Sequence, residues 1–132
     1  MLDALLLAGS RVLLPVAGEP GPLRWALYSG PRSLVPAAYG LLEPSGESMP
    51  AEAVAEADMV LIPALAVDRR GVRLGRGAGF YDRTLSQASP SAILAGVVFD
   101  EEYVDQLPGE PHDVPVTHVL TPRFGLRRVG SE

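Results

Sequence analysis

The 132-residue sequence contains no cysteine and no lysine. Without cysteine there are no disulfides, no thiolate zinc sites and no cysteine nucleophiles. Every basic residue is an arginine, and the formal net charge is -5. This charge argues against a general nucleic-acid-binding protein, because such proteins bind phosphate backbones with an excess of positive side chains.

Long apolar runs are also missing. The run at residues 5–8 is too short to span a bilayer and lacks the basic flank of a signal peptide. We therefore predict a cytoplasmic protein with no membrane partner. The length fits one domain, residues 1–132, and 47% hydrophobic and 20% charged residues are typical of an ordinary globular protein.

Short apolar runs separated by turn residues predict the N-terminal elements. Residues 11–16 and 23–28 have the pattern of two strands joined as a hairpin. Residues 30–50 are rich in Gly, Pro and Ser, which predicts irregular chain. The remaining predicted elements outside the central part are a helix over 2–8, a short helix over 101–107, a strand over 118–121 and an exposed tail after Pro122.

The central part of the chain predicts a βαβ unit. The run 58–67 is apolar on both faces, like a central strand of a covered sheet, and residues 92–99 form a second apolar strand. A helix over residues 80–88 lies between them. Strands joined in this way are parallel, with a right-handed crossover. The predicted fold class is therefore α/β, a three-layer α/β/α domain with a mainly parallel central sheet.

The most informative segment runs from Gly71 to Arg83 and reads GVRLGRGAGFYDR. Its alternating glycines let the backbone approach a ligand closely, because glycine has no Cβ and tolerates positive φ. Arginines beside them offer planar forks that fit phosphate or carboxylate oxygens. The segment follows an apolar strand and leads into a helix, where open α/β sheets bind anionic ligands. The hypothesis is a nucleotide site in which Asp82 holds a metal ion on the phosphates.

Other interpretations of these residues remain open. The glycines match neither the Walker lysine motif nor the dinucleotide fingerprint, so a glycine-rich turn also explains them. Asp82 is equally typical of the first turn of a helix, and Asp113 of a turn or cap. Glu110, His112 and Asp113 fit an acid–base cluster, but two histidines and no cysteine are too few for a zinc set.

Two motifs taken together resemble those of the 5-formyltetrahydrofolate cyclo-ligases (methenyltetrahydrofolate synthetases). The first motif is Gly71-x-Arg73-Leu74-Gly75-x-Gly77-x-Gly79-Phe80-Tyr81-Asp82-Arg83, preceded by residues 62–68. The second motif is Pro108-x-Glu110-x-His112-Asp113-x-x-Val116, in the order and at the distance that the family shows. Residues 12–15 and 40–44 also resemble family landmarks, so the resemblance covers nearly the whole chain.

The resemblance implies a reaction and a set of site residues. The reaction is the ATP-dependent conversion of 5-formyltetrahydrofolate, a small-molecule substrate, to 5,10-methenyltetrahydrofolate through a phosphorylated formyl intermediate, with Mg²⁺. Asp82 and Asp113 would hold Mg²⁺, Arg76 and Asp82 would be catalytic, and residues 76–80 would also face the folate near its formyl group. The residues that would line the ATP phosphates are Arg73, Leu74, Gly75, Arg76, Gly77, Ala78, Gly79, Phe80 and Tyr81.

Members of this family usually begin with a basic helical region, and this chain begins about where that region ends. No lysine is present to replace the cation of that region. We therefore expect a chain that is N-terminally truncated relative to the family and weakly active or inactive. The alternatives are a nucleotide- or folate-binding protein that has lost catalysis, and a family relative that acts on another small carboxylated substrate.

Overall fold

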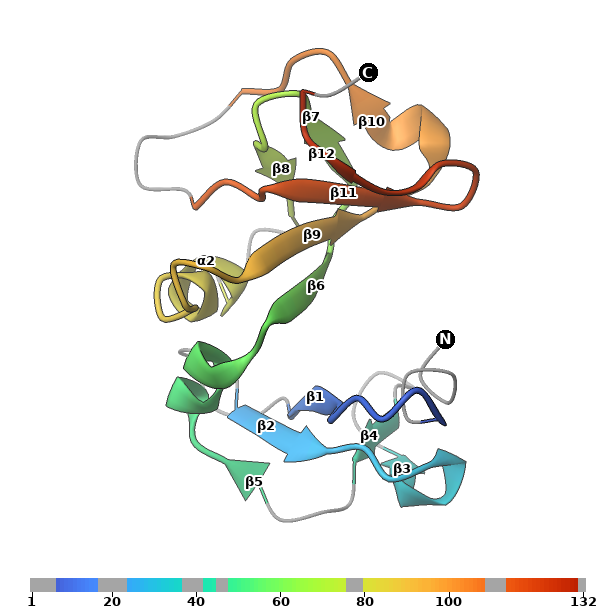
Figure 1. Cartoon of the computed structure of the whole chain (residues 1–132), viewed down its shortest axis with the longest axis vertical. Helices are drawn as coiled ribbons and strands as arrows, with labels where there is room; N and C mark the ends of the chain where they lie inside the picture. The colour runs from blue at the N-terminus through green and yellow to red at the C-terminus, as the bar shows by residue number, and fades with distance from the viewer. Residues whose placement is uncertain are drawn as a thin grey trace. The chain divides into compact units, whose positions relative to one another are not determined.

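The structure, a computed structural model, describes the chain in residues 7–16, 24–36, 42–44, 48–75, 80–108 and 114–130, with the side chains of residues 33, 42–44, 80 and 82 excepted. Within it the chain divides into two compact units, Met1–Ala53 and Val54–Glu132. Sequence patterns alone treat residues 1–132 as one domain. Figure 1 traces both units in chain order from blue to red.

The N-terminal unit is built on a three-stranded antiparallel sheet in the order β1-β2-β5. β1 (Leu13–Val16) pairs with β2 (Arg24–Leu27), which pairs in turn with β5 (Ser48–Met49). The predicted hairpin is confirmed. Trp25 is buried, as the alternating apolar pattern predicts, but Leu27 on the same face is exposed and the neighbouring Ala26 is buried.

The prediction of irregular chain between residues 30 and 50 is wrong. The short 3-10 helix η1 (Pro31–Ser33) leads into β3 (Leu34–Pro36), which pairs antiparallel with β4 (Leu42–Pro44). The sequence pattern did not predict these strands because each ends in a proline. A two-stranded ribbon tolerates proline, because an edge strand has backbone N–H groups that need no partner. A second 3-10 helix, η3 (Ala51–Glu56), follows.

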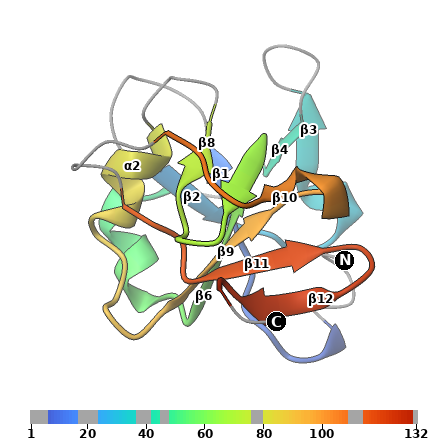
Figure 2. The same cartoon turned by 90° about the horizontal axis from the view of Figure 1, so that it is seen from above.

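The C-terminal unit contains a four-stranded sheet in the order β12-β11-β9-β6. β6 (Met59–Pro63), β9 (Ile93–Val97) and β11 (His118–Thr121) run parallel, which confirms the predicted parallel pairing of the two apolar strands. β12 (Gly125–Arg128) returns antiparallel to β11, and Figure 2 shows this hairpin in red. The tail after Pro122 is largely exposed, as predicted, but it forms a strand that the sequence pattern did not predict.

The predicted continuous strand over residues 58–67 breaks after Pro63. The N–H of Leu65 donates to the carbonyl oxygen of Leu74 at 2.8 Å, so the chain leaves the four-stranded sheet and enters a second one. Proline favours this exit, because it has no N–H for a ladder hydrogen bond. The second sheet has the order β10-β7-β8.

This second sheet lies against the four-stranded sheet at a glycine. It consists of β7 (Ala66–Asp68), β8 (Arg73–Leu74), antiparallel to β7, and β10 (Tyr103–Val104), parallel to β7. A Cβ on Gly96 of β9 would lie 2.6 Å from Cγ2 of Val67, a fully buried residue. Glycine is therefore required at this contact between the sheets.

Helices in the described ranges are few and short. α2 (Phe80–Leu85) confirms a helix after the glycine-rich segment, although it ends before residue 88. The predicted helix over residues 101–107 is wrong: a 3-10 turn, η4 (Asp100–Glu102), leads directly into β10, where β7 provides a strand partner. The predicted helix over residues 2–8 lies almost wholly outside the described residues.

The fold is therefore mixed α/β with several small sheets (Figure 1). The predicted three-layer α/β/α arrangement with a mainly parallel central sheet is not confirmed by the described elements. No helix within the described ranges is both long and apolar enough to cross a membrane.

Candidate functional site

The turn between β7 and β8 positions the start of the glycine-rich segment. The N–H of Asp68 donates to the carbonyl oxygen of Val72 at 2.9 Å, and the N–H of Gly71 donates to the carbonyl oxygen of Asp68 at 3.1 Å. Gly71 has φ +88°, in the left-handed region that side chains disfavour. A glycine at this position allows the chain to reverse within four residues.

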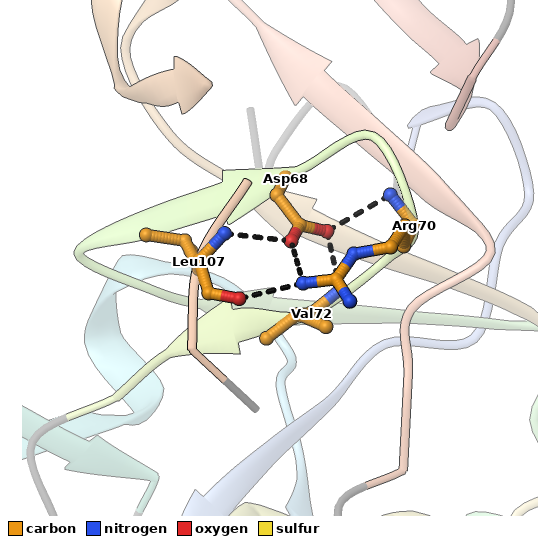
Figure 3. A network of polar contacts seen from close by, with 4 residues as sticks. All are labelled: Asp68, Arg70, Val72 and Leu107. Atoms are coloured by element: carbon orange, nitrogen blue, oxygen red, sulfur yellow. Dashed lines mark hydrogen bonds and ion pairs between the residues drawn. The ribbon is translucent and has the colours of Figure 1, made fainter. Parts of the chain in front are cut away.

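The carboxylate of Asp68 organises this turn, as Figure 3 shows. Its Oδ1 accepts hydrogen bonds from the backbone N–H groups of Arg70, at 2.8 Å, and Val72, at 2.9 Å. Its Oδ2 accepts from the backbone N–H of Leu107 at 2.9 Å and from Nη2 of Arg70 at 3.0 Å. The side chain of Asp68 has no solvent exposure, so these four donors replace the water that a charged carboxylate requires.

Burial and hydrogen bonding act on Asp68 in opposite directions. Burial by itself raises the pKa of the carboxyl, because the charged form loses its water. Hydrogen bonds from the backbone of Leu107, Arg70 and Val72, and from the side chain of Arg70, outweigh burial and hold the pKa of Asp68 below its ordinary value. Asp68 is therefore a negatively charged carboxylate at neutral pH.

Three of the predicted phosphate-lining residues come together beyond this turn. Nη1 of Arg73, on β8, lies 3.4 Å from the position that a Cβ on Gly75 would occupy. Burial raises the pKa of the Tyr81 hydroxyl, and the positive charge of Arg73 lowers it in part, with a net increase. The guanidinium of Arg73 therefore lies beside Gly75, and its positive charge acts on the Tyr81 hydroxyl. The neighbouring Leu74 is exposed.

The other predicted site residues lie wholly or partly outside the described part of the chain. Phe80 and Asp82 belong to α2, and their side chains are not described. The residues that lie wholly outside are Arg76, Gly77, Ala78, Gly79, Glu110, His112 and Asp113. Among the described side chains no group of three or more His, Cys, Asp or Glu is arranged to hold a metal ion. The Mg²⁺ site at Asp82 and Asp113 stays a prediction.

Asp68 is the residue whose importance sequence reasoning missed. It entered that reasoning only as the last residue of the stretch before the first motif. Two signals were present: an acid at the end of an otherwise apolar run, and a glycine three residues later. A buried acid needs several donors, and a tight turn supplies backbone N–H groups at short range.

Comparison with known proteins places the chain in one family. The model of the 5-formyltetrahydrofolate cyclo-ligase family matches residues 1–122. A 5-formyltetrahydrofolate cyclo-ligase of Mycolicibacterium smegmatis is 56% identical over 131 residues, covering 96% of this chain and 67% of that protein. One from Escherichia coli K12 is 34% identical over 125 residues, covering 92% of this chain and 69% of that protein.

Solved structures agree with this result. The NMR structure of Aquifex aeolicus 5,10-methenyltetrahydrofolate synthetase matches with a TM-score of 0.76 and 28% identity, over 99% of this chain and 64% of that one. A Mycoplasma pneumoniae 5,10-methenyltetrahydrofolate synthetase matches in fold, with a TM-score of 0.64 and 19% identity, over 89% of this chain and 60% of that one. The chain thus spans about two thirds of the length of the proteins it matches.

Proposed function

The chain belongs to the 5-formyltetrahydrofolate cyclo-ligase family, a family of ligases, and from that premise we propose that it converts 5-formyltetrahydrofolate to 5,10-methenyltetrahydrofolate with ATP. The observation that carries the proposal is the family match over residues 1–122, which includes both motifs. The grouping of Arg73, Gly75 and Tyr81 supports it. A cytoplasmic location belongs to the same proposal.

The described donors suit an anionic group such as a nucleotide phosphate. Arg73 offers a planar guanidinium that can bind two oxygens at once, and its Nη1 lies beside Gly75. Tyr81 has a raised pKa, so its hydroxyl remains neutral at physiological pH and can donate a hydrogen bond. Bound ATP would supply the phosphoryl group that converts the formyl oxygen into a leaving group.

In the proposed reaction the formyl oxygen of the substrate accepts the terminal phosphoryl group, and ADP is released. N10 of the folate then attacks the formyl carbon and loses its proton, and phosphate departs as the ring closes. In such a reaction the protein contributes mainly by positioning the reactants and stabilising the charge on the transferred group. Arg73 would stabilise the charge on the transferred group, and the turn at Asp68 holds β8, which carries Arg73, in place.

Mg²⁺ is also part of the proposal, with Asp82 and Asp113 as its ligands and Arg76 beside the reacting formyl group. Carboxylate oxygens are the ligands that Mg²⁺ prefers together with phosphate oxygens and water. These residues carry over from the two family motifs, and the described part of the chain contains no competing acidic cluster.

The test is turnover by the purified chain, measured as formation of 5,10-methenyltetrahydrofolate and of phosphate in equal amounts. ATP binding is measured separately by calorimetry, for wild type and for Arg73→Met. We expect ATP binding and weak turnover, with both weakened further in the variant. ATP binding without turnover would support a nucleotide-binding protein that has lost catalysis. If the chain shows no ATP binding and no turnover, the proposal is refuted.

A further inference from the structure

We propose that Asp68 is a positioning residue that holds both ends of the segment 108–115 against the turn at residues 68–72. This inference rests on the proposed function, in which Asp113 of that segment binds Mg²⁺. The turn leads directly into β8 with Arg73, so it joins the two motifs of the site. Asp68 itself contacts neither substrate nor metal in this proposal.

The N-terminal end of the segment is held at Leu107. The backbone N–H of Leu107 donates to Oδ2 of Asp68 at 2.9 Å. Its carbonyl oxygen accepts a hydrogen bond of 2.6 Å from Nη2 of Arg70, which also contacts Oδ2 of Asp68 at 3.0 Å (Figure 3). Both backbone polar groups of one residue are therefore bound by a single carboxylate–guanidinium pair. We name this arrangement the Leu107 clamp.

The C-terminal end of the segment is held at Val116, on the same turn. The N–H of Val116 donates to the carbonyl oxygen of Gly71 at 2.9 Å. A Cβ on Gly71 would overlap the carbonyl oxygen of Val116 and lie 3.2 Å from Cβ of Pro115. The approach of Val116 thus depends on Gly71, whose own N–H is bound to the carbonyl oxygen of Asp68. Residues 68–72 hold the chain on both sides of residues 109–113.

These two anchors set where the segment begins and ends relative to Arg73. Groups that orient metal ligands from behind affect metal affinity or activity by about 10- to 100-fold when they are removed. A carboxylate that only closed its own turn would need Oδ1 alone, which accepts from Arg70 and Val72. The bonds from Oδ2 to Leu107 and Arg70 instead reach a segment 39 residues away and the side chain that binds it.

Asp68→Asn separates the two roles. The amide oxygen of asparagine still accepts from the backbone of Arg70 and Val72, so the turn is retained. The amide NH₂ replaces Oδ2 and cannot accept from Leu107 or from the guanidinium, so the Leu107 clamp is lost. Arg70→Met removes the other half of the clamp at a side chain that is 54% exposed, where loss of folding is not expected.

Asp105→Asn is the matched control. It removes an exposed ion pair, Arg69 Nε to Asp105 Oδ1 at 3.0 Å, between the same turn and the residues that precede Leu107. The Asp105 side chain is 93% exposed, and pairs of this kind contribute little. The control therefore makes the same chemical change without touching the clamp.

The experiment combines two measurements on wild type and the three variants. The first is the MgCl₂ concentration that gives half-maximal turnover at saturating ATP. The second is hydrogen–deuterium exchange of individual amides, read by NMR. We expect Asp68→Asn and Arg70→Met to raise the required MgCl₂ about tenfold or more. Exchange should also become faster at Leu107 in both variants, with Val116 and β9 unchanged because the turn is retained, and Asp105→Asn should match wild type.

Each other outcome has a definite meaning. Faster exchange confined to residues 68–72, or a lower melting temperature with an unchanged need for MgCl₂, would overturn the positioning role. A wild-type chain without turnover, but with the Leu107 amide released in Asp68→Asn, would refute the proposed function and support the clamp.

Discussion

Replacement of Gly71 by alanine should destabilise the C-terminal unit more than a glycine-to-alanine change at any other positive-φ position that the structure describes in that unit. Gly71 has φ +88°, and a non-glycine residue in the left-handed region costs about 1–2 kcal/mol. A Cβ would also overlap the Val116 carbonyl oxygen, so Val116 must move and its hydrogen bond to Gly71 is strained or lost. A net hydrogen bond contributes about 1 kcal/mol, which brings the expected loss to about 2–3 kcal/mol.

Gly125→Ala separates backbone strain from the overlap. Gly125 also has positive φ, +66°, but nothing lies within 4 Å of the position that its Cβ would occupy. Both glycines belong to the unit Val54–Glu132, so both changes act on the same compact unit. We expect Gly125→Ala to lose only about 1–2 kcal/mol.

The assay is urea unfolding followed by circular dichroism, with the free energy of unfolding compared at equal slope. Faster exchange of the Val116 amide in Gly71→Ala would locate the loss at the expected contact. Equal losses in the two variants would show that the overlap with Val116 has no energetic effect, and would refute the close approach on which one anchor of segment 108–115 depends.

Three further predictions follow from other contacts of the C-terminal unit. The pKa of Asp68 is lower in the folded chain than its ordinary value, so its contribution to stability is present at neutral pH and is lost as pH falls below about 4. The urea midpoints of wild type and Asp68→Asn should therefore converge in acid. A difference between the midpoints that stays constant with pH would contradict this prediction. Gly96→Ala should lower the free energy of unfolding by about 1–3 kcal/mol through overpacking, since its Cβ would lie 2.6 Å from Cγ2 of Val67. In a double-mutant cycle, Val67→Ala should offset part of that loss, and additive losses would exclude the contact. Arg73→Met should raise the pKa of Tyr81 further, because the charge of Arg73 lowers it now, and ultraviolet titration of the tyrosines measures this; an unchanged titration would separate the two side chains.

Local patterns predicted the strands whose signal is local. The alternation around Trp25 predicted β2, and the apolar run at residues 92–99 predicted β9. The break after Pro63 was missed, because the run of apolar residues continues through Val67 while the partner of Leu65 is Leu74, beyond the turn. Likewise, β10 exists because β7 lies beside it, and no pattern within residues 101–107 encodes that partner.

For the candidate site, too, the sequence predicted what lies within a short motif and missed what depends on distant residues. Arg73, Gly75 and Tyr81 were predicted together because they share a short motif. Arg73 lies beside Gly75 and its charge acts on the Tyr81 hydroxyl, and their contact with the phosphates stays a prediction. The role of Asp68 depends on a donor at Leu107, 39 residues away, which no short-range pattern reveals. The pairing of Asp82 with Asp113 stays a prediction based on the two motifs.

Closing a four-residue turn with a buried carboxylate costs desolvation free energy that a neutral side chain does not. An asparagine or serine side chain also accepts hydrogen bonds from backbone N–H groups and carries no charge to desolvate. Buried charges are weak evidence for stability, but their geometric requirements can select one arrangement of the chain over others. Asp68 satisfies four donors only when Leu107 and the Arg70 guanidinium are both in place, so its desolvation cost penalises any arrangement in which the segment after Leu107 has moved away. The charge of Asp68 therefore favours the one arrangement in which Leu107 lies against the turn at residues 68–72. A neutral acceptor at position 68 would favour that arrangement less strongly.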